Sequence, residues 1–283
     1  MDYLSEKSIN QFIDSALVED VGDGDHSSLS SIPKGAESKA RLIIKGEGIL
    51  AGMMLAEKIV ERVDPTLKIE VFLKDGSAVK TGDIGFHLYG NVHAILKAER
   101  LVLNCMQRMS GIATLTQELT KRIAHTKAKL LDTRKTTPNF RLPEKWAVKI
   151  GGGENHRFGL YDMILLKDNH VDYAGGVRKA IEASKEYLLR TGKNLRIEIE
   201  TRNLSEVKEA LETGGMHRIM LDNMKLSAMK EAVEMINGQY ETEASGGITA
   251  LTILEIAETG VDYISVGALT HSVKSMDISM KAF

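Results

Sequence analysis

From Lys129 onward, short runs of apolar, β-rich residues alternate with amphipathic stretches of helical periodicity. Parallel strands need a crossover connection, usually a helix, so this alternation predicts a parallel sheet with helices between its strands. The expected strands are residues 128–132, 162–166, 195–200, 217–221, 240–244 and 262–266. The expected helices are residues 175–191, 205–212, 226–236 and 249–258. Six strands fall short of the usual eight of a β/α barrel, so a smaller barrel and an open doubly wound sheet both fit.

The part of the chain before Ile112 mixes helical and extended patterns. Helical spacing of apolar residues predicts helices over residues 6–17, 53–63 and 93–125. The last of these would be interrupted near Ser110-Gly111. Extended segments separated by turn signals are expected over residues 38–44, 68–73 and 84–89. These patterns predict a sheet decorated with helices.

The composition argues against several classes of protein. A formal net charge of −2 and 5% aromatic residues among 283 do not give the footprint of a nucleic-acid binder. The sequence contains no apolar run of ~18 residues, which is the length that a membrane-spanning helix needs. The first residues do not resemble a signal peptide. The single cysteine, Cys105, lies in an apolar run and is expected to be a small buried residue. One cysteine also suits a reducing compartment, so a cytoplasmic location is expected.

Positive charge is concentrated in one glycine-interrupted stretch, residues 132–170, inside this slightly acidic chain. A cleft lined with one sign of charge attracts small, highly charged ligands, so a substrate with several carboxylates or phosphates is expected. Two of the basic residues, Arg141 and Lys145, lie in a helical segment without a neighbouring glycine or strand end, and we interpret them as solvated surface charges. The basic residues are Arg134, Lys135, Arg141, Lys145, Lys149, His156, Arg157 and Lys167.

Nearly every predicted strand is followed by polar residues or glycine. One such group alone would be a helix cap more often than a ligand. Six of them at the carboxyl ends of parallel strands indicate a binding site, because these ends meet at one edge of the sheet. The six groups are residues 132–135, 167–170, 200–201, 222–223, 245–247 and 267–268.

The residue types at this edge suggest separate roles. Glu200 and Asp222 would bind sugar hydroxyls or a divalent ion, or would serve as structural partners for the nearby cations. The glycines of the last two loops, at 246, 247 and 267, would expose backbone N–H groups to a phosphate, helped by the positive end of the following helix. The acidic segment EDVGDGDH at residues 19–26 lacks a calcium-loop pattern and is interpreted as a turn with side-chain caps.

Several of these motifs occur together in one known family. DTRKTTP, GGG followed by HR-x-GL-x-D, LLKDNH, ASGGI and SVGALTHS appear in this order, and the chain thereby resembles the quinolinate phosphoribosyltransferases. The resemblance implies an N-terminal α/β sandwich domain and a C-terminal α/β barrel with fewer than eight strands. We place the first domain at residues 1–112, joined by residues 272–283, and the barrel at residues 113–271. Asn139 departs from the glycine that the family commonly has at this point.

The resemblance also implies a reaction and a homodimer. Quinolinate and 5-phosphoribosyl-1-pyrophosphate would react with Mg²⁺ to give nicotinate mononucleotide, pyrophosphate and CO₂. The implied quinolinate contacts are Arg134, His156 and Arg157, with Lys135 and Lys167 between the base and the donor. Glu200 and Asp222 would bind the ribose hydroxyls and metal, and the loops with Ser245, Gly246, Gly247 and Gly267 would hold the phosphate. Arg100 would reach the pocket of the neighbouring subunit.

Two kinds of alternative fit part of the pattern. A related pyrophosphorylase associated with molybdenum transport shares the DTRKT and HR features, and we expect it to depart at LLKDNH. A non-catalytic anion-binding barrel would bind quinolinate without releasing pyrophosphate, and a nucleic-acid binder would use the basic loop. Glu200 and Asp222 beside the basic groups argue against nucleic acid, since their charge would repel its backbone.

Overall fold

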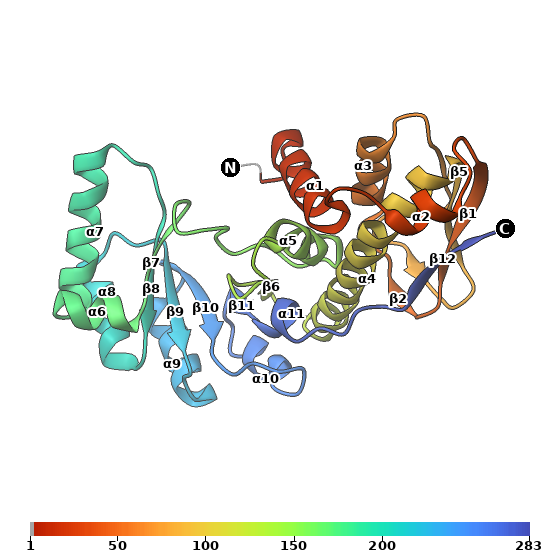
Figure 1. Ribbon diagram of the computed structural model, residues 1–283. Helices are drawn as coiled ribbons and strands as arrows, with labels where there is room; N and C mark the ends of the chain where they lie inside the picture. Colours follow the sequence, from red (N-terminus) through yellow and green to blue (C-terminus); the bar gives the residue numbers. More distant parts are fainter. Residues whose placement is uncertain (1–2) are drawn as a thin grey trace. The chain divides into compact units, whose positions relative to one another are not determined.

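The computed structural model describes residues 3–283, which form two compact units (Figure 1). The barrel unit comprises Glu118–Lys135 and Gly153–Ala268. The N-terminal unit comprises the described residues up to Gln117, together with Thr136–Gly152 and Leu269–Phe283. The domain boundaries at residues 112 and 271 stay predictions. No helix within residues 3–283 is long and apolar enough to cross a membrane.

The barrel unit is built on a six-stranded parallel sheet. In spatial order its strands are β6 (Lys129–Leu131), β11 (Tyr263–Ser265), β10 (Glu241–Ser245), β9 (Arg218–Asp222), β8 (Ile197–Thr201) and β7 (Ile164–Leu166). All six strands predicted from the sequence are confirmed, and β6 and β7 are the two edges of the sheet. The predicted fold class, an α/β protein with an incomplete barrel, is therefore confirmed.

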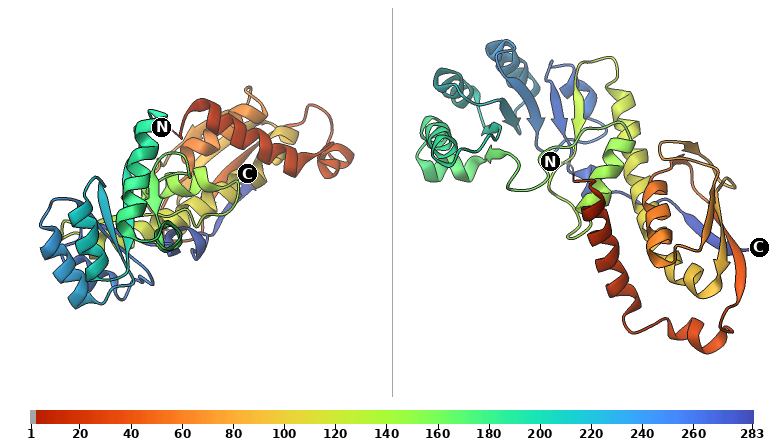
Figure 2. Two further views of the ribbon diagram at one scale, coloured as in Figure 1. Left: turned by 90° about the vertical axis from the view of Figure 1, so that its left-hand side faces the viewer. Right: turned by 90° about the horizontal axis from the view of Figure 1, so that it is seen from above.

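Helices cover the outer face of this sheet (Figure 2). They are α6 (Asp168–Ala174), α7 (Val177–Thr191), α8 (Leu204–Thr213), α9 (Leu226–Ile236) and α10 (Ile253–Ala257). The chain leaves this unit at α11 (Ala268–His271), whose residues from Leu269 onward belong to the N-terminal unit. The strand residues that face them, such as Ile199, Ile219 and Ala244, are fully buried. Burying one aliphatic side chain contributes about 1.5–3 kcal/mol, so this layer holds the strands in place.

Two details of these helices differ from the prediction. Helix α10 has five residues, half the predicted length, because residues 249–252 form turns stabilised by hydrogen bonds between Thr249 and Thr252. Helix α6 was not expected, since its seven residues lack an apolar stripe of useful length.

The N-terminal unit contains an antiparallel sheet in the order β12 (Ile278–Ala282), β1 (Glu37–Ile44), β5 (Ile84–Asn91) and β3 (Lys68–Val71). A short pair, β2 (Gly48–Ile49) with β4 (Ala78–Val79), lies apart from it. The helices of this unit are α1 (Glu6–Val21), α2 (His26–Ser31), α3 (Met53–Val63), α4 (Val92–Arg122, whose last residues belong to the barrel unit) and α5 (Arg141–Ile150). The last strand of the chain thus pairs with the first.

The long helix α4 is continuous, so the predicted interruption at Ser110-Gly111 is wrong. Gly111 serves a different purpose, because a Cβ at this position would overlap the backbone carbonyl of Lys274. The glycine lets the segment before β12 approach the helix closely. Cys105 lies in the same helix and is fully buried, as predicted, and burial raises the pKa of its thiol to about 12.

The interpretation of Lys145 as a surface charge is also wrong, since the residue is fully buried in α5. Its helix is tied to α4 by Glu144, which accepts hydrogen bonds from Arg108 and from the backbone N–H of Thr137. Arg141 is half-buried and donates to the hydroxyl of Thr136. The periodicity of α5 identified a helix, but not which charged residues faced inward.

The predicted capped turn of the acidic segment is confirmed, and the conformation of Asn139 is compatible with its loop. In the acidic segment, Asp25 accepts hydrogen bonds from the backbone N–H and the hydroxyl of Ser28 and caps α2. Asn139 has a φ of 60°, a left-handed conformation that asparagine tolerates better than most residues. The departure from glycine at this position therefore leaves the turn intact.

Candidate active site

Alternation along three neighbouring strands directs a set of charged side chains to one face of the barrel sheet. Successive side chains of a strand point to opposite faces, so Glu198 and Glu200 of β8 share a face. The strand register places Glu198 beside Arg218 of β9, which in turn lies beside Glu241 of β10. The same face therefore carries charged residues in rows from the amino ends of the strands towards the carboxyl ends.

The upper part of this face holds two of the predicted carboxylates and a lysine. Oε2 of Glu200 lies 3.5 Å from Nζ of Lys167, and Oε1 of Glu200 accepts a hydrogen bond of 3.4 Å from the backbone N–H of Asp168. Burial raises the pKa of Glu200, Lys167 counteracts this, and the charge of Asp222 raises it further. The structure thus brings Glu200, Asp222 and Lys167 close together, as the sequence predicted.

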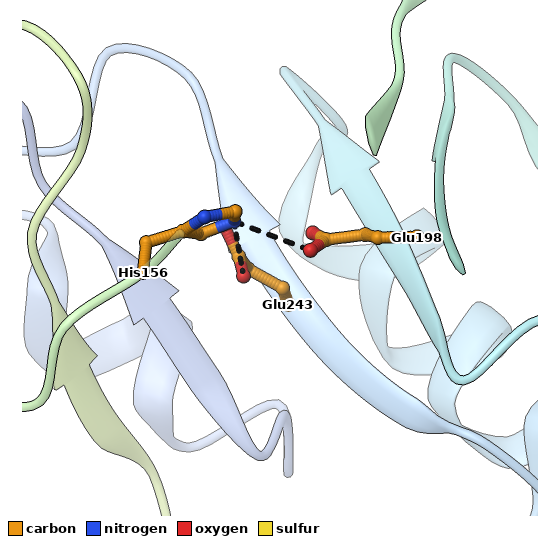
Figure 3. Close-up of side chains that lie close together, drawn as sticks. All are labelled: His156, Glu198 and Glu243. Atoms are coloured by element: carbon orange, nitrogen blue, oxygen red, sulfur yellow. Dashed lines mark ion pairs between the residues drawn. The ribbon is translucent and has the colours of Figure 1, made fainter. Parts of the chain in front are cut away.

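A second group lies deeper and centres on His156 (Figure 3). Nε2 of His156 lies 3.2 Å from Glu198 Oε2 and 3.5 Å from Glu243 Oε2. Nδ1 of the same ring accepts a hydrogen bond of 2.7 Å from the backbone N–H of Arg157. An accepting Nδ1 places the ring proton on Nε2, where it faces the two carboxylates. The backbone N–H of His156 donates to Asp132 at the end of β6.

Both glutamates of this group are fully buried. Burial raises the pKa of Glu198 to about 7, although Arg218 opposes the shift. Burial likewise raises the pKa of Glu243 to about 7, and the neighbouring charge of Glu198 adds to the shift.

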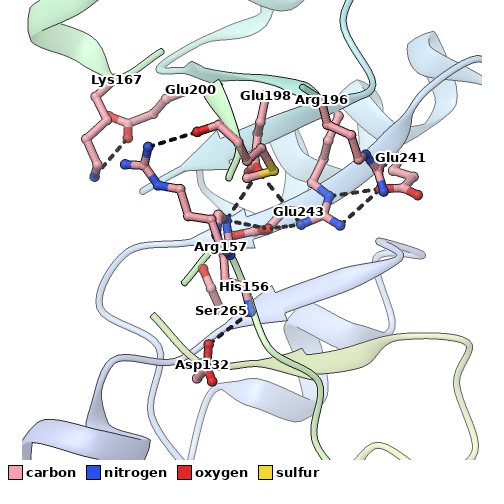
Figure 4. A network of polar contacts seen from close by, with 12 residues as sticks. Asp132, His156, Arg157, Lys167, Arg196, Glu198, Glu200, Glu241, Glu243 and Ser265 are labelled. Atoms are coloured by element: carbon pink, nitrogen blue, oxygen red, sulfur yellow. Dashed lines mark hydrogen bonds and ion pairs between the residues drawn. The ribbon is translucent and has the colours of Figure 1, made fainter. Parts of the chain in front are cut away.

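Arg157 extends from His156 towards the first group (Figure 4). Its Nη1 donates to the backbone carbonyl of Met163, and its side chain is half-buried. Burial lowers the pKa of Arg157, and the positive charge of Arg134 lowers it further, while Glu198 raises it. Two guanidinium groups that repel each other in a half-buried setting form a site that an anion would stabilise.

The predicted phosphate loop after β10 has the backbone conformation that its glycines suggest. Gly246 has a φ of 94° and Gly247 a φ of 60°. The backbone N–H of Asn223 donates to the carbonyl of Ser245, and the Asn223 amide donates to Asp222. Gly267 lies directly before α11, a helix of four residues. Helices α10 and α11 are short, so their dipoles add less positive potential here than predicted.

The remaining predicted residues lie in different places. Lys135 is exposed just after β6, and its backbone N–H donates to the Thr133 hydroxyl. Arg100 is an exposed residue of α4 in the N-terminal unit, and its contact with a neighbouring subunit stays a prediction. The sequence reasoning missed Glu198, Arg218 and Glu243. All three lie inside parallel strands, which are usually continuous apolar runs. A charged residue within such a strand is the sequence signal that would have identified them.

The residues of the first group fit a Mg²⁺ ion. Magnesium binds proteins through one or two carboxylates, and it completes its shell with water and substrate phosphates. Glu200 and Asp222 supply two carboxylates near enough to repel each other, and this repulsion is what a cation would relieve. Lys167, whose Nζ lies 3.5 Å from Glu200 Oε2, carries one positive charge and so compensates only part of the negative charge of the two carboxylates.

The fold and the site together define a class: an α/β barrel protein whose charged groups at the carboxyl edge of its sheet suit a small, multiply charged anion. Comparison with known proteins narrows the class. Residues 25–110 match the N-terminal domain and residues 112–281 the C-terminal domain of quinolinate phosphoribosyl transferase. The chain belongs to the quinolinate phosphoribosyl transferase family.

Named relatives resemble the chain over most of their length. A mitochondrial quinolinate phosphoribosyltransferase (decarboxylating) of Nicotiana tabacum is 50% identical over 94% of this chain and 80% of its own length. A probable nicotinate-nucleotide pyrophosphorylase (carboxylating) of Bacillus subtilis is 39% identical over 97% and 92%. The solved nicotinate-nucleotide pyrophosphorylase of Francisella tularensis is 39% identical, covers 97% of this chain and 96% of its own, and superposes with a TM-score of 0.88.

Proposed function

We propose that this protein is a quinolinate phosphoribosyltransferase, a pentosyltransferase of de novo NAD synthesis. It transfers phosphoribosyl from 5-phosphoribosyl-1-pyrophosphate to the ring nitrogen of quinolinate. The products are nicotinate mononucleotide, pyrophosphate and CO₂. The observation that carries this proposal is the pairing of two groups on one barrel face. A cationic group around Arg157 suits a diacid, and an acidic group around Glu200 suits a sugar and its metal.

The cationic group would bind quinolinate. Arg134 and Arg157 repel each other, and the carboxylates of the substrate would relieve that repulsion. His156 is proposed as a third contact for these carboxylates, and its ring nitrogens face Glu198, Glu243 and the Arg157 N–H in the structure. Lys135, just after β6, is proposed to lie between the base and the donor.

The acidic group and the glycine loops would bind the phosphoribosyl donor. Glu200 and Asp222 would accept hydrogen bonds from the ribose hydroxyls, and Lys167 would face the donor phosphates. The backbone N–H groups of the Ser245-Gly246-Gly247 loop and of Gly267 would hold the 5-phosphate. Mg²⁺ bound to Glu200 and Asp222 would neutralise the charge of the leaving pyrophosphate.

Catalysis then depends on position and electrostatics rather than on a covalent intermediate. The bond between ribose C1 and pyrophosphate breaks with both electrons leaving on oxygen, and the quinolinate nitrogen donates its lone pair to C1. The positively charged ring accepts the electrons of the C2–carboxylate bond as CO₂ leaves, and C2 then takes up one proton.

A direct assay tests the proposal. Quinolinate, 5-phosphoribosyl-1-pyrophosphate and Mg²⁺ are supplied together, and CO₂ and pyrophosphate are measured in the same reaction. Equal amounts of both products are expected. Nicotinate is the control, because it has no second carboxylate to lose. Binding of quinolinate without release of pyrophosphate would instead identify an anion-binding barrel, and the proposal would be wrong.

Two further features belong to the proposal. The active form is a homodimer in which Arg100 of one subunit reaches the site of the other. Sedimentation tests the dimer. Mixing Arg100→Ala subunits with subunits inactivated at the site tests the shared site, because mixed dimers should regain activity. A cytoplasmic location is proposed from the single cysteine. Fractionation of cells that make the protein tests it.

A further inference from the structure

A chain of buried charges lies beneath the proposed quinolinate site and has no role in the reaction described above. Glu198 and Glu243 are fully buried and Arg218 is 8% exposed. All three project from the same face of β8, β9 and β10, below Glu200 and Asp222. Charged residues are rarely buried this deeply unless they are paired with an opposite charge, because removing a charge from water costs several kcal/mol.

Arg218 is held by three side chains from the two strands β10 and β11. Its Nη1 donates to Glu243 Oε2 at 2.7 Å, and its Nε donates to Glu241 Oε2 at 3.0 Å. Its guanidinium lies 4.0 Å from the centre of the Tyr263 ring, within the range of a cation–π interaction. An arginine fixed on three sides fixes its partners in turn, so the carboxylate of Glu243 has little freedom to rotate.

The fixed carboxylate of Glu243 faces His156, as does that of Glu198. The distances from Nε2 are 3.5 Å and 3.2 Å. On its other side the ring accepts the backbone N–H of Arg157 through Nδ1. Contacts therefore run without a gap from Arg218 through Glu243 to His156, and from His156 to the backbone of Arg157.

The same three side chains, His156, Glu198 and Glu243, have ligand atoms within 4.8 Å of one another, a spacing that a metal ion tolerates. Arg218 argues against that use. Its Nη1 lies 2.7 Å from Glu243 and 3.7 Å from Glu198, so one positive charge already stands beside both carboxylates. The guanidinium thus offsets part of the negative charge that would hold a divalent ion here.

We propose that Glu243, held by Arg218, is a positioning residue that orients His156 and through it Arg157 for binding a carboxylate of quinolinate. The inference rests on the proposed function and deepens it. Because the donor is expected to bind at the separate group around Glu200, loss of the Glu243 charge should affect the two substrates unequally. Quinolinate binding weakens, and donor binding does not.

The first experiment compares two substitutions on the same face of β10. Glu243→Gln keeps the shape of the side chain and removes its charge, and Glu241→Gln does the same at a residue that contacts Arg218 but not His156. In assays at about pH 8, where Glu243 is ionised, we expect Glu243→Gln to raise KM for quinolinate about tenfold, the effect of one weakened charge-assisted contact, with kcat and KM for the donor changed less than about twofold. Because Glu241 holds Arg218 but does not contact His156, Glu241→Gln should raise KM for quinolinate less than Glu243→Gln does, with kcat and KM for the donor near those of the wild type. An equal rise in both KM values would indicate general loosening and overturn the proposal.

The second experiment tests whether Glu243 acts through His156. The single variants Glu243→Gln and His156→Asn are combined in one chain, and KM for quinolinate is measured for all four proteins. If Glu243 acts through His156, the double variant should have nearly the same KM for quinolinate as His156→Asn alone. Additive effects would overturn the proposal. If the wild type itself fails to release pyrophosphate, the proposed function fails instead, and the same cycle read by quinolinate calorimetry still tests the contact chain.

Discussion

At the scale of single residues, the decisive feature is a pair of half-buried arginines. Burial and the nearby Arg134 both destabilise the charged form of Arg157, so its pKa is lowered. A bound carboxylate would reverse this, and a charge-assisted hydrogen bond contributes about 1.5–3 kcal/mol. We therefore predict that Arg157→Ala weakens quinolinate binding by roughly 10- to 100-fold, as measured by titration calorimetry.

A matched control exists on the surface of the same unit. Arg202 is exposed and pairs with Asp172 and Glu206. Surface ion pairs contribute about 0–1 kcal/mol, so Arg202→Ala should leave quinolinate affinity unchanged. Unchanged affinity in Arg157→Ala would remove this residue from the site.

A second residue-scale prediction concerns the glycine loop after β10. Gly246 and Gly247 both have positive φ, so alanine is strained at either position. Only at Gly246 would the added Cβ overlap a neighbour, the side-chain amide of Asn223, whereas Gly247 faces open space. Gly246→Ala should therefore raise KM for the donor several-fold more than Gly247→Ala. Steady-state kinetics on both variants check this, and equal effects would show that backbone strain alone matters.

Residue-level predictability was uneven for a physical reason. Lys167, Glu200 and Asp222 were identifiable because they follow strands, and strand ends meet at one edge. The buried position of Lys145 was not identifiable, since helical periodicity locates a stripe but not the neighbour that covers it. Glu198 and Glu243 were not identifiable as buried, since alternation along a strand assigns a residue to a face of the sheet but does not show whether that face is covered.

At the scale of elements, the strands and long helices followed directly from their hydrophobic periods. Helices α3 and α9 have the predicted bounds, because each has an apolar stripe over several turns. The short helices α2, α6 and α11 and the strands β2, β4 and β12 were not predicted. Their formation depends on caps and on neighbours distant in sequence, and local patterns do not report these.

The junction of β7 and α6 offers an element-scale prediction. Glu200 of β8 holds this junction by accepting the Asp168 N–H and by pairing with Lys167. Glu200→Gln keeps the shape but removes one of two proposed Mg²⁺ ligands, so the Mg²⁺ concentration for half-maximal rate should rise about tenfold or more. Wild-type activity should disappear with a chelator and return with Mg²⁺.

A control for this change is Glu212→Gln. Glu212 is an exposed residue of α8 that pairs with Arg178. It should not alter the Mg²⁺ requirement. A Glu200→Gln enzyme with the Mg²⁺ dependence of the wild type would mean that the ion is held by substrate and Asp222 alone.

At the scale of the whole molecule, burying two glutamates has a cost that depends on pH. Burial raises the pKa of Glu243 to about 7 from 4.5, so the folded protein keeps a proton that the unfolded chain releases above pH 4.5. The stability that this proton contributes is fully present below pH 4.5 and is lost as pH rises through about 7. The effect is about 1.4 kcal/mol for each tenfold difference in proton affinity.

The contribution of Glu243 to this pH dependence can be isolated by measuring the wild type and a variant that lacks this carboxyl group over the same pH range. Glutamine at position 243 cannot titrate, so the urea midpoint of Glu243→Gln should fall less than that of the wild type between about pH 5 and pH 7. Circular dichroism follows the unfolding, and titrating groups that do not contact Glu243 cancel because both chains share them. If the two midpoints change in parallel, Glu243 is ionised throughout this range in the folded protein. Arg218 would then compensate its charge fully, and the barrel interior would be held by a permanent ion pair rather than by a shared proton.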